Sequence, residues 1–360
     1  MKPMNKTAVV ILNWNGAGYL KKFMPLLEER TPRDRAFIVV ADNGSTDDSL
    51  TYLEKHHPGV LVIRFDRNYG FAGGYNRALQ QIEADYYVLL NSDIEVTGGW
   101  LDPLTRYMDQ HPGMAACQPV ILDYRKNDRY EYAGAAGGFI DRYGYTFCRG
   151  RIFDAVEEFN PDYQHEGEIF WATGACLMVR PEAFHGAGGF DEDFFAHMEE
   201  VDLCWRLKNQ GYTIGFQPGS RVYHVGGGSL PRSNPFKTYL NFRNNLFLLY
   251  KNLPRNKRRT ILFTRMLLDL ISMLLFLFRL RGKEVAAVGR AHRDFYRHRR
   301  RYKELSKTGG GNQKTINFVT IYTRSIVVEY FLRGNRLFRQ LDRAFVAAHT
   351  GPGKTNSETE

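Results

Sequence analysis

Short apolar runs that alternate with helix-like stretches constrain the fold of this chain more than any other feature of its sequence. Each run is rich in β-branched or aromatic residues and is bounded by Asn, Asp, Gly or Pro, which is typical of a strand. Parallel neighbours need a long crossover, usually a helix, so this order predicts an α/β domain with a mostly parallel sheet. The predicted strands are Ala8 to Leu12, Phe37 to Ala41, Val60 to Phe65 and Tyr86 to Leu90, and the predicted helices are Tyr19 to Glu29, Asp47 to His56 and Gly73 to Ala84.

A polar cluster follows each of these four predicted strands. In open parallel sheets, ligands bind beyond the carboxyl ends of the strands, which lie at one edge. The four clusters therefore predict one binding site. They are Asn13 to Gly16, Asp42 to Ser45, Arg67 to Gly70 and Asn91 to Asp93.

Regular patterns are weaker further along the chain. The segment Thr97 to Gln164 has little periodicity and allows no assignment. Beyond it, Trp171 to Arg180 is predicted as a strand, and Met198 to Asn209 as a helix that Gly211 ends. Two more strands are predicted at Tyr212 to Phe216 and Val222 to His224.

Three of the polar motifs suggest nucleotide and metal chemistry. Asp42 could accept hydrogen bonds from a base or ribose, although a capped turn explains its motif as well. The small residues from Asn68 to Arg77 would let a backbone approach a phosphate at a helix N-terminus, with a close-packed turn as the alternative. Asp93 emerges from a buried strand, where a carboxylate can bind Mg²⁺ or Mn²⁺. A lone Asp after a strand is more often a turn residue.

Acidic residues crowd together at the start of the helix predicted from Met198. One of Glu199, Glu200 and Asp202 could act as a general base, while the alternative is an acidic first turn favoured by the helix dipole. His224 ends a predicted strand before three glycines, and alone it would more often be structural.

Charge divides the chain into two parts. Residues 1–230 carry 22 Lys and Arg against 31 Asp and Glu, a net −9, whereas residues 231–360 carry 27 against 8, a net +19. Within the basic part, Ile261 to Leu280 is apolar but interrupted by Arg265, Asp269, Ser272 and Arg279 at helical spacing. It is a poor membrane-spanning candidate, and we expect it to lie in a bilayer interface beside the Arg290 to Lys303 cluster. The alternative is a core helix with a solvated basic neighbour.

The cysteines and the N-terminus indicate a reducing, cytoplasmic location. Cys117, Cys148, Cys176 and Cys204 are widely spaced and form no CxxC pair. Residues 1–7 lack the apolar stretch of a signal peptide. With the basic region, this predicts a protein on the inner face of the cell membrane.

Taken in order, these segments resemble the family 2 glycosyltransferases of GT-A fold, a Rossmann-like fold, and in particular a bacterial rhamnosyltransferase-like branch. The resemblance covers about residues 7–250 and rests on Val10 to Asn15, Asp42 to Asp47, Asn68 to Asn76, Leu89 to Asp93, Gly174 and Ala175, Gly188 to Phe195, Glu199 to Arg206, and His224. It implies a GT-A domain at 1–230, with a nucleotide-sugar half at about 1–95 and an acceptor half at about 96–230. A basic, helical, membrane-associating region with a flexible tail would follow at 231–360.

The resemblance also implies an inverting transfer of a sugar, rhamnose in that branch, from a nucleotide diphosphate to a lipid-linked or polysaccharide acceptor in cell-surface glycan synthesis. Glu200 would be the base, with Glu199 in reserve, and Asp93 and His224 would hold Mg²⁺ or Mn²⁺. Donor-binding residues would be Asn13, Asn15, Asp42, Asn43, Asn68, Gly70, Phe71, Asn76, Asn91, Ser92 and Asp93, and acceptor-binding residues Trp171, Gly174, Ala175 and Asp202.

Two departures from the family pattern bear on the site. Asn91 stands where the family's DxD motif has Asp, which removes an anionic ligand, and Glu199-Glu200 stands where Glu-Asp is common. A nucleotidyltransferase is a rival, but Asn13 to Gly18 has no basic residue to cradle a triphosphate. A catalytically silent membrane-bound homologue is another. A nucleic-acid partner is not expected, because no recognised motif accompanies the arginines.

Overall fold

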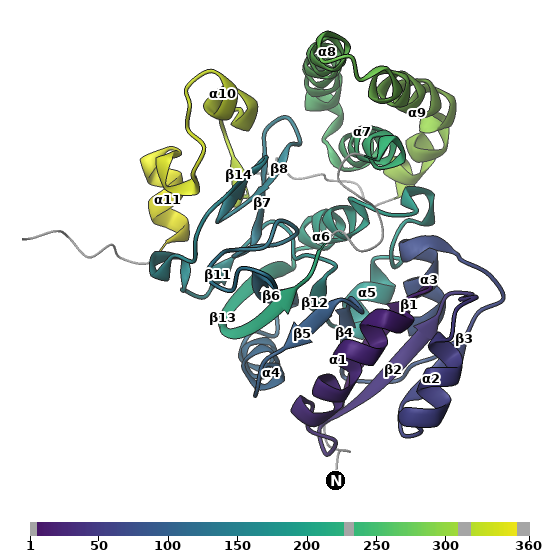
Figure 1. Cartoon of the computed structure of the whole chain (residues 1–360). Helices are drawn as coiled ribbons and strands as arrows, with labels where there is room; N and C mark the ends of the chain where they lie inside the picture. Colours follow the sequence, from purple (N-terminus) through teal and green to yellow (C-terminus); the bar gives the residue numbers. More distant parts are fainter. Residues whose placement is uncertain (1–5, 227–233, 309–317, 351–360) are drawn as a thin grey trace, which may run out of the picture.

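The computed structural model describes residues 6–226, 234–308 and 318–350, with side chains described in the second range as far as Tyr302. A nine-stranded sheet forms the centre, and a smaller five-stranded sheet and a group of long helices lie beside it (Figure 1). The predicted α/β class with a mostly parallel central sheet is confirmed in its first half. The second half adds antiparallel strands.

The first four strands pair in parallel in the order β3-β2-β1-β4. All four lie within one residue of their predicted bounds at each end. The elements are β1 (Thr7–Asn13), α1 (Ala17–Arg30), β2 (Ala36–Asp42), α2 (Ser49–His56), β3 (Leu61–Arg64), α3 (Gly70–Leu79) and β4 (Tyr86–Leu90).

The sheet continues from β4 through β12, β6 and β13 to β11, and β5 also pairs with β13. The two strands predicted at Tyr212 to Phe216 and Val222 to His224 are one strand, β13, with an irregular register between Gln217 and Arg221. The strand predicted from Trp171 begins only at Cys176. The elements are β5 (Ile94–Val96), α4 (Leu101–Gln110), β6 (Met114–Asp123), β11 (Gly167–Glu168), β12 (Cys176–Val179), α5 (Pro181–Gly186), α6 (Glu199–Asn209) and β13 (Thr213–His224).

The later part of the unassigned segment Thr97 to Gln164 contributes four short strands to the smaller sheet, with strand order β10-β9-β8-β7-β14. Its last strand comes from far along the chain, and Phe338 and Phe345 pack against Phe139 and Phe147 at this sheet. Residues 318–350 of the basic region therefore belong to the body of the protein. The elements are β7 (Gly138–Asp141), β8 (Thr146–Cys148), β9 (Arg151–Ile152), β10 (Ala155–Val156), β14 (Ile321–Tyr322), α10 (Ile326–Phe331), α11 (Arg343–His349), and the 3-10 turns η1 (Pro161–Tyr163), η2 (Glu192–Phe194) and η3 (Phe338–Gln340).

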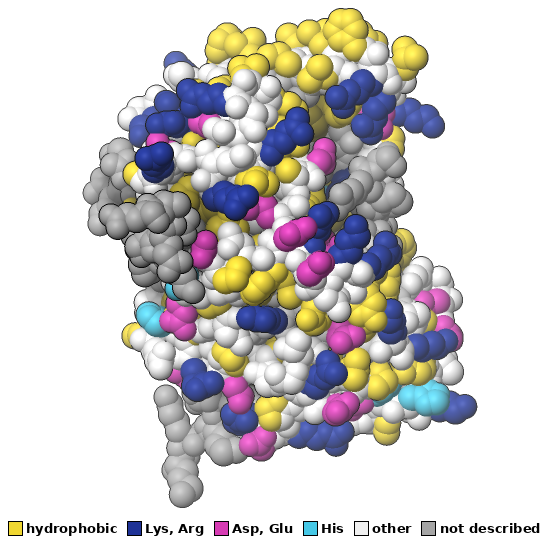
Figure 2. All heavy atoms as spheres, turned by 60° about the vertical axis from the view of Figure 1, so that its left-hand side comes forward, with side chains coloured by type: hydrophobic (Ala, Val, Ile, Leu, Met, Phe, Trp, Pro, Cys, Tyr) yellow, Lys and Arg dark blue, Asp and Glu magenta, His cyan; other side chains and the backbone are white. Residues whose placement is uncertain are grey.

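Three long helices make up the rest of the basic region: α7 (Pro235–Asn252), α8 (Arg255–Phe278) and α9 (Gly282–Thr308). Helix α8 directs charged side chains towards the protein and apolar side chains towards the surface. Arg265 and Asp269 are buried against each other at 2.8 Å, while Leu270, Leu274 and Phe278 are 51%, 46% and 82% exposed. The polar stripe faces the protein, and apolar side chains gather at the top of the space-filling view, the end of the molecule where α8 lies (Figure 2).

Helix α8 is long and apolar enough, by length and composition alone, to cross a membrane, and only 17% of its most apolar window is buried. This differs from the sequence-based expectation that Ile261 to Leu280 is a poor membrane-spanning candidate. The structure extends the helix back to Arg255, and its interrupting charges Arg265 and Asp269 are paired inside the protein.

Candidate functional site

The carboxyl ends of β1 and β2 form one hydrogen-bonded group. Asn13 and Asp42 are register partners, and Asn13 Nδ2 donates to Asp42 Oδ2 at 3.0 Å. The other Asp42 oxygen accepts from the Ser45 amide at 2.9 Å, and Ser45 Oγ accepts from the amide of exposed Asn15 at 2.9 Å. Asn13 Oδ1 is buried and has no partner among the described residues, so the group offers an unused acceptor.

A second asparagine network shapes the turn before α3. Asn43 Nδ2 donates to Asn68 Oδ1 at 3.0 Å, and Asn68 Oδ1 also accepts from the Gly70 amide at 2.8 Å. The Tyr69 amide donates to Asn43 Oδ1 at 3.0 Å. Asn43 and Asn68 therefore hold the turn before α3 next to the carboxyl end of β2.

The N-terminus of α3 binds another loop of the protein. The Phe71 amide donates to the Phe195 carbonyl at 2.8 Å, and Gly70, at φ +72°, lies so close that a Cβ there would meet the Phe195 ring at 2.6 Å. Asn76 exchanges two hydrogen bonds with the backbone of Phe190, at 2.8 and 2.9 Å. These contacts fit the close-packed turn that was the alternative interpretation of this segment, and the donor-binding roles of Gly70, Phe71 and Asn76 stay predictions.

Strand pairing brings Asp93 to His224. His224 is the register partner of Ile94 across β13 and β5, and its Nε2 lies 3.1 Å from Asp93 Oδ1. The other ring nitrogen, Nδ1, lies 3.1 Å from Glu131 Oε2. All three side chains are buried, at 5 to 8% exposed. Burial alone would lower the pKa of His224, but Asp93 and Glu131 outweigh it and raise this pKa to about 10.

This triad fits a divalent metal with help from a ligand. A metal-bound histidine usually directs its second nitrogen to a carboxylate, as His224 does to Glu131. With the His224 proton displaced on metal binding, Asp93 and His224 Nε2 would supply one oxygen and one nitrogen, and diphosphate oxygens could complete the shell. Among the described residues, His, Cys, Asp and Glu form no ready-made group of three or more able to hold a metal.

Glu199, which is buried, and Glu200, which is partly buried, open α6. One oxygen of each, Oε2, is buried and finds no hydrogen-bond partner in the described part of the chain. Burial raises the pKa of Glu200 to about 7, and burial together with the nearby Glu200 charge raises the pKa of Glu199 well above its usual range. A buried carboxyl group whose pKa lies near neutrality is suited to accept a proton.

Small residues connect these clusters into one site. A Cβ on Gly16 would lie 2.4 Å from Asn13 Oδ1 and 3.5 Å from Ser92 Oγ. A Cβ on Gly174 would lie 3.0 Å from the Phe71 ring and 4.0 Å from the Glu200 Cβ. The next residue, Ala175, accepts the Asn91 amide at 2.9 Å. These contacts link the Asn13 group to Ser92, and the segment that holds Gly174 and Ala175 to both Asn91 and Glu200.

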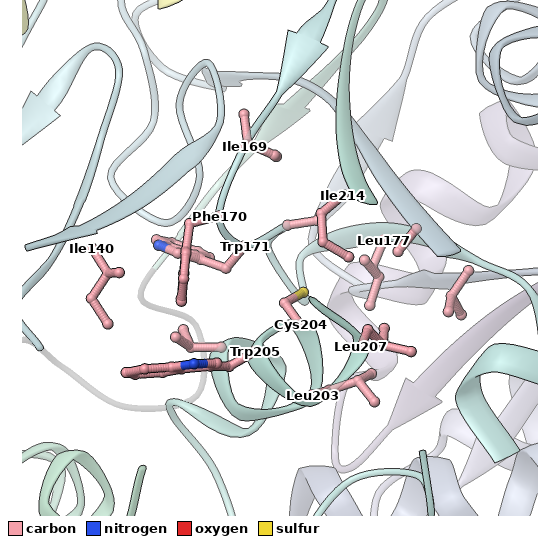
Figure 3. Packing of buried hydrophobic residues seen from close by; sticks show 14 of the residues in the cluster. Ile140, Ile169, Phe170, Trp171, Leu177, Leu203, Cys204, Trp205, Leu207 and Ile214 are labelled. Atoms are coloured by element: carbon pink, nitrogen blue, oxygen red, sulfur yellow. The ribbon is translucent and has the colours of Figure 1, made fainter. Parts of the chain in front are cut away.

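Two residues expected to bind an acceptor are buried instead. Trp171 is 3% exposed, donates from Nε1 to the Phe139 carbonyl at 2.9 Å, and lies in the core with Phe170 and Trp205 (Figure 3). Asp202 is 0% exposed and binds Lys251 and Arg206, each at 2.8 Å. The structure therefore gives Trp171 and Asp202 structural roles, which corrects the expectation.

No sequence motif pointed to Glu131 as a member of the site, and the role of Ser45 within its polar cluster was not specified. Glu131 lies in the segment without periodicity, between two tyrosines, and no motif marks it. The Ser45 hydroxyl accepts hydrogen bonds from the Asn15 amide and from the Asn13 side chain, the latter at 3.2 Å.

Comparison with protein families gives a match to the model described as Glycosyl transferase family 2, over residues 8–185. Among curated proteins, the chain is 29% identical over 236 residues to the N-acetylglucosaminyl-diphospho-decaprenol L-rhamnosyltransferase of Mycobacterium tuberculosis, covering 60% of this chain and 75% of that protein. It is 22% identical over 247 residues to the low-salt glycan biosynthesis hexosyltransferase Agl10 of Haloferax volcanii, covering 67% and 74%.

Solved structures share the fold at low identity. GalNAc-T7 with UDP, GalNAc and Mn²⁺ gives a TM-score of 0.55 at 18% identity, over 70% of this chain and 48% of that one. Staphylococcus aureus TarS 1–349 with UDP-GlcNAc gives 0.54 at 15% identity, over 83% of each chain. The mannosyltransferase PcManGT of Pyrobaculum calidifontis, with GDP-Man and Mn²⁺, gives 0.51 at 14%, over 86% and 85%.

The buried Glu200 carboxyl group predicts a pH-dependent gain in stability on its neutralisation. Folding raises the pKa of Glu200. The folded protein is therefore destabilised by the charge of this carboxyl group as the pH rises through about 7. We expect Glu200→Gln to raise the free energy of unfolding by on the order of 2 kcal/mol at pH 8 and to change it little at pH 5. Denaturant unfolding at both pH values measures this, with exposed Glu158→Gln as control. An equal effect at the two pH values would contradict it.

Proposed function

We propose a specific reaction for this chain, which is a glycosyltransferase with a family 2 domain of GT-A fold. It transfers a sugar with inversion to a hydroxyl of a lipid-linked or polysaccharide acceptor in cell-surface glycan synthesis. The donor is a nucleotide sugar, and rhamnose is the sugar to test first. The rhamnosyltransferase similarity, with a lipid diphosphate in that protein's name, supports both choices.

One observation carries this proposal. Two neighbouring glutamates, each with a buried Oε2 that has no hydrogen-bond partner among the described residues, lie near the edge of the central sheet that carries Asp42 and the Asp93–His224 pair. A buried carboxyl group without a partner is costly, so its retention at a ligand-binding edge points to proton transfer. A capped turn or an acidic helix start would not bring the other groups there.

In the proposed reaction, Glu200 takes the proton of the acceptor hydroxyl. The hydroxyl oxygen then forms a bond to the anomeric carbon while the bond from that carbon to the diphosphate oxygen breaks from the opposite face. The electron pair of that bond leaves with the nucleoside diphosphate. Glu199, whose pKa is raised further by the charge of Glu200, stays protonated beside the base.

On the donor side, we propose that Asp42 and Asn13 hold the nucleoside, with Asn15, Asn43 and Asn68 shaping that edge. Asn91 and Ser92 follow β4 and lie beside the path to the diphosphate, and Gly174 and Ala175 leave room for the acceptor near Glu200.

We propose that Asp93 and His224 Nε2 hold Mg²⁺ or Mn²⁺, which would supply positive charge to the departing diphosphate. Asn91 in place of an acidic residue removes one charged ligand. Glu131 would compensate in part, because it directs His224 and raises the basicity of its free nitrogen.

The basic helical region gives the proposed acceptor a membrane context. No part of the described chain covers the exposed apolar face of α8, which we define as Phe263, Leu267, Leu270, Ile271, Leu274, Leu275, Leu277 and Phe278. Exposed Arg293, Arg297 and Arg300 lie on the neighbouring helix α9. Apolar insertion and cation attraction together fit the inner surface of an anionic membrane. We therefore propose a peripheral protein on its cytoplasmic side.

Transfer assays with a panel of nucleotide sugars and Mn²⁺ test the function. We expect donor-dependent transfer by the wild type, and a loss of about 100-fold or more in kcat for Glu200→Gln, because a general base contributes about 10²–10⁴-fold. Asp93→Ala should lose transfer as well. If no donor supports transfer or raises the melting temperature, the proposal fails. If both variants keep wild-type rates, the roles of Glu200 and Asp93 are wrong.

Removal of the Glu131 charge tests the metal site. We expect Glu131→Gln to weaken Mn²⁺ binding about 10- to 100-fold, since loss of an orienting carboxylate commonly has that effect. Titration of the protein and nucleoside diphosphate with Mn²⁺, followed by electron paramagnetic resonance, measures binding without turnover. Exposed Glu158→Gln is the control. Unchanged Mn²⁺ affinity would contradict the orienting role.

Polar substitutions on α8 test membrane binding. We expect the wild type to float with vesicles that contain anionic lipid, and the triple variant Leu270→Gln, Leu274→Gln, Phe278→Gln to remain unbound, because it removes apolar insertion. Leu61→Gln, at a side chain 56% exposed on β3, is the matched control. Flotation of the triple variant at wild-type levels, or no flotation of the wild type at low salt, would refute the proposal.

A further inference from the structure

The loop that leads into α6 adopts a conformation that its own sequence does not favour. Phe195, His197 and Met198 have φ values of +64°, +68° and +71°, although none of them is glycine. Bulky residues in the left-handed region persist only when their surroundings determine the backbone. The loop ends at Glu199, where α6 begins, so its course sets the direction of the first turn and of both glutamates.

Backbone carbonyls from Asp193 to His197 are all bound by groups outside the loop. The Phe195 carbonyl accepts from the Phe71 amide of α3 at 2.8 Å. The remaining four face α7. Arg243 Nη2 donates to the Asp193 carbonyl at 2.7 Å and to the Phe194 carbonyl at 3.2 Å. The loop is therefore held between the catalytic half of the chain and the helical region.

Asn244 makes most of the contacts on the α7 side. Its Nδ2 donates to the carbonyls of Phe194, Ala196 and His197, at 2.9, 2.9 and 2.7 Å. Its Oδ1 accepts from Arg243 Nε at 2.9 Å, and the side chain is 0% exposed. The Asn244 amide has two hydrogens, so it can bind three carbonyls only if the carbonyls lie close together. The observed conformation of the loop brings them together in this way.

We infer that Asn244 is a positioning residue, which holds the loop at 193–198 so that Glu199 and Glu200 point into the site. The inference rests on the proposed function for its catalytic consequence. The helical region then has a second role besides membrane contact, since α7 completes the active site from outside the domain that matches the family model.

Other contacts between α6 and α7 do not replace this role. Lys251 and Asn252 bind the Asp202 side chain, each at 2.8 Å, and so fix α6 one turn further along. They leave the backbone between Asp193 and Met198 untouched. Arg243 and Asn244 are the α7 residues whose hydrogen bonds to that backbone are described above.

The test compares Asn244→Asp and Asn244→Ala with Asn245→Ala. Asn245 is the matched control, because it is the next residue of α7, is 2% exposed and donates to a backbone carbonyl, that of Gly144, at 2.6 Å. For both Asn244 variants we expect kcat to fall about 100-fold with the donor KM changed by less than about threefold, since misplacement of a reacting group affects the transition state. Asn245→Ala should keep its kcat per folded molecule.

Hydrogen exchange of the peptide that spans residues 193–202 provides a readout that needs no substrate. We expect faster exchange there in both Asn244 variants and unchanged exchange in Asn245→Ala. If Asn244→Asp does not fold, Asn244→Ala decides. Wild-type kcat in the Asn244 variants, or wild-type exchange of this peptide, overturns the inference. If the wild type uses no nucleotide sugar, the proposed function fails while the exchange result still decides whether Asn244 holds the loop.

Discussion

The pairing of β13 with β5 and β6 is the interaction on which the site depends. His224, the last residue of β13, has Ile94 and Asp123 as its register partners, so one strand end brings together the loop that carries Asp93 and the chain that leads to Glu131. A slip of one residue would turn His224 to the other face of the sheet. The irregular register between Gln217 and Arg221 thus helps to place the histidine.

The sequence predicted well the first four strands of the central sheet, and it predicted the smaller sheet and the distant members of the candidate site less completely. β-Branched runs bounded by polar residues marked β1, β2 and β4 because their signal is local. The smaller sheet gave no such signal: its strands are short, and β7 pairs with β14 from far along the chain. Glu131 and Asn244 were missed for the same reason, since their partners are distant in sequence. Trp171 and Asp202 were misread because residue type does not reveal burial.

Helix α8 shows that a periodic pattern alone does not reveal which face of a helix is buried. The sequence revealed a polar stripe at Arg265, Asp269 and Ser272, but such a stripe can face water or the protein. In the structure Asp269 binds Arg265 and lies 3.1 Å from His292 Nε2, and Arg265 also binds Asn245, so the charges are satisfied inside. The apolar residues are left outside. The partners of the polar residues, rather than the period, therefore determine which face needs an apolar environment.

The same reasoning separates structural from functional acids within α6. Glu199 and Asp202 are both buried, at 5% and 0% exposed. Burial would raise the pKa of Asp202, but Lys251 and Arg206 outweigh it and lower this pKa to about 2. Glu199 and Glu200 have no such cations, so burial raises their pKa values. The ion pairs of Asp202 stabilise α6. We infer that these ion pairs and the Asn244 contacts together stabilise the start of the helix, where the loop has positive φ angles and each glutamate has an Oε2 without a partner among the described residues.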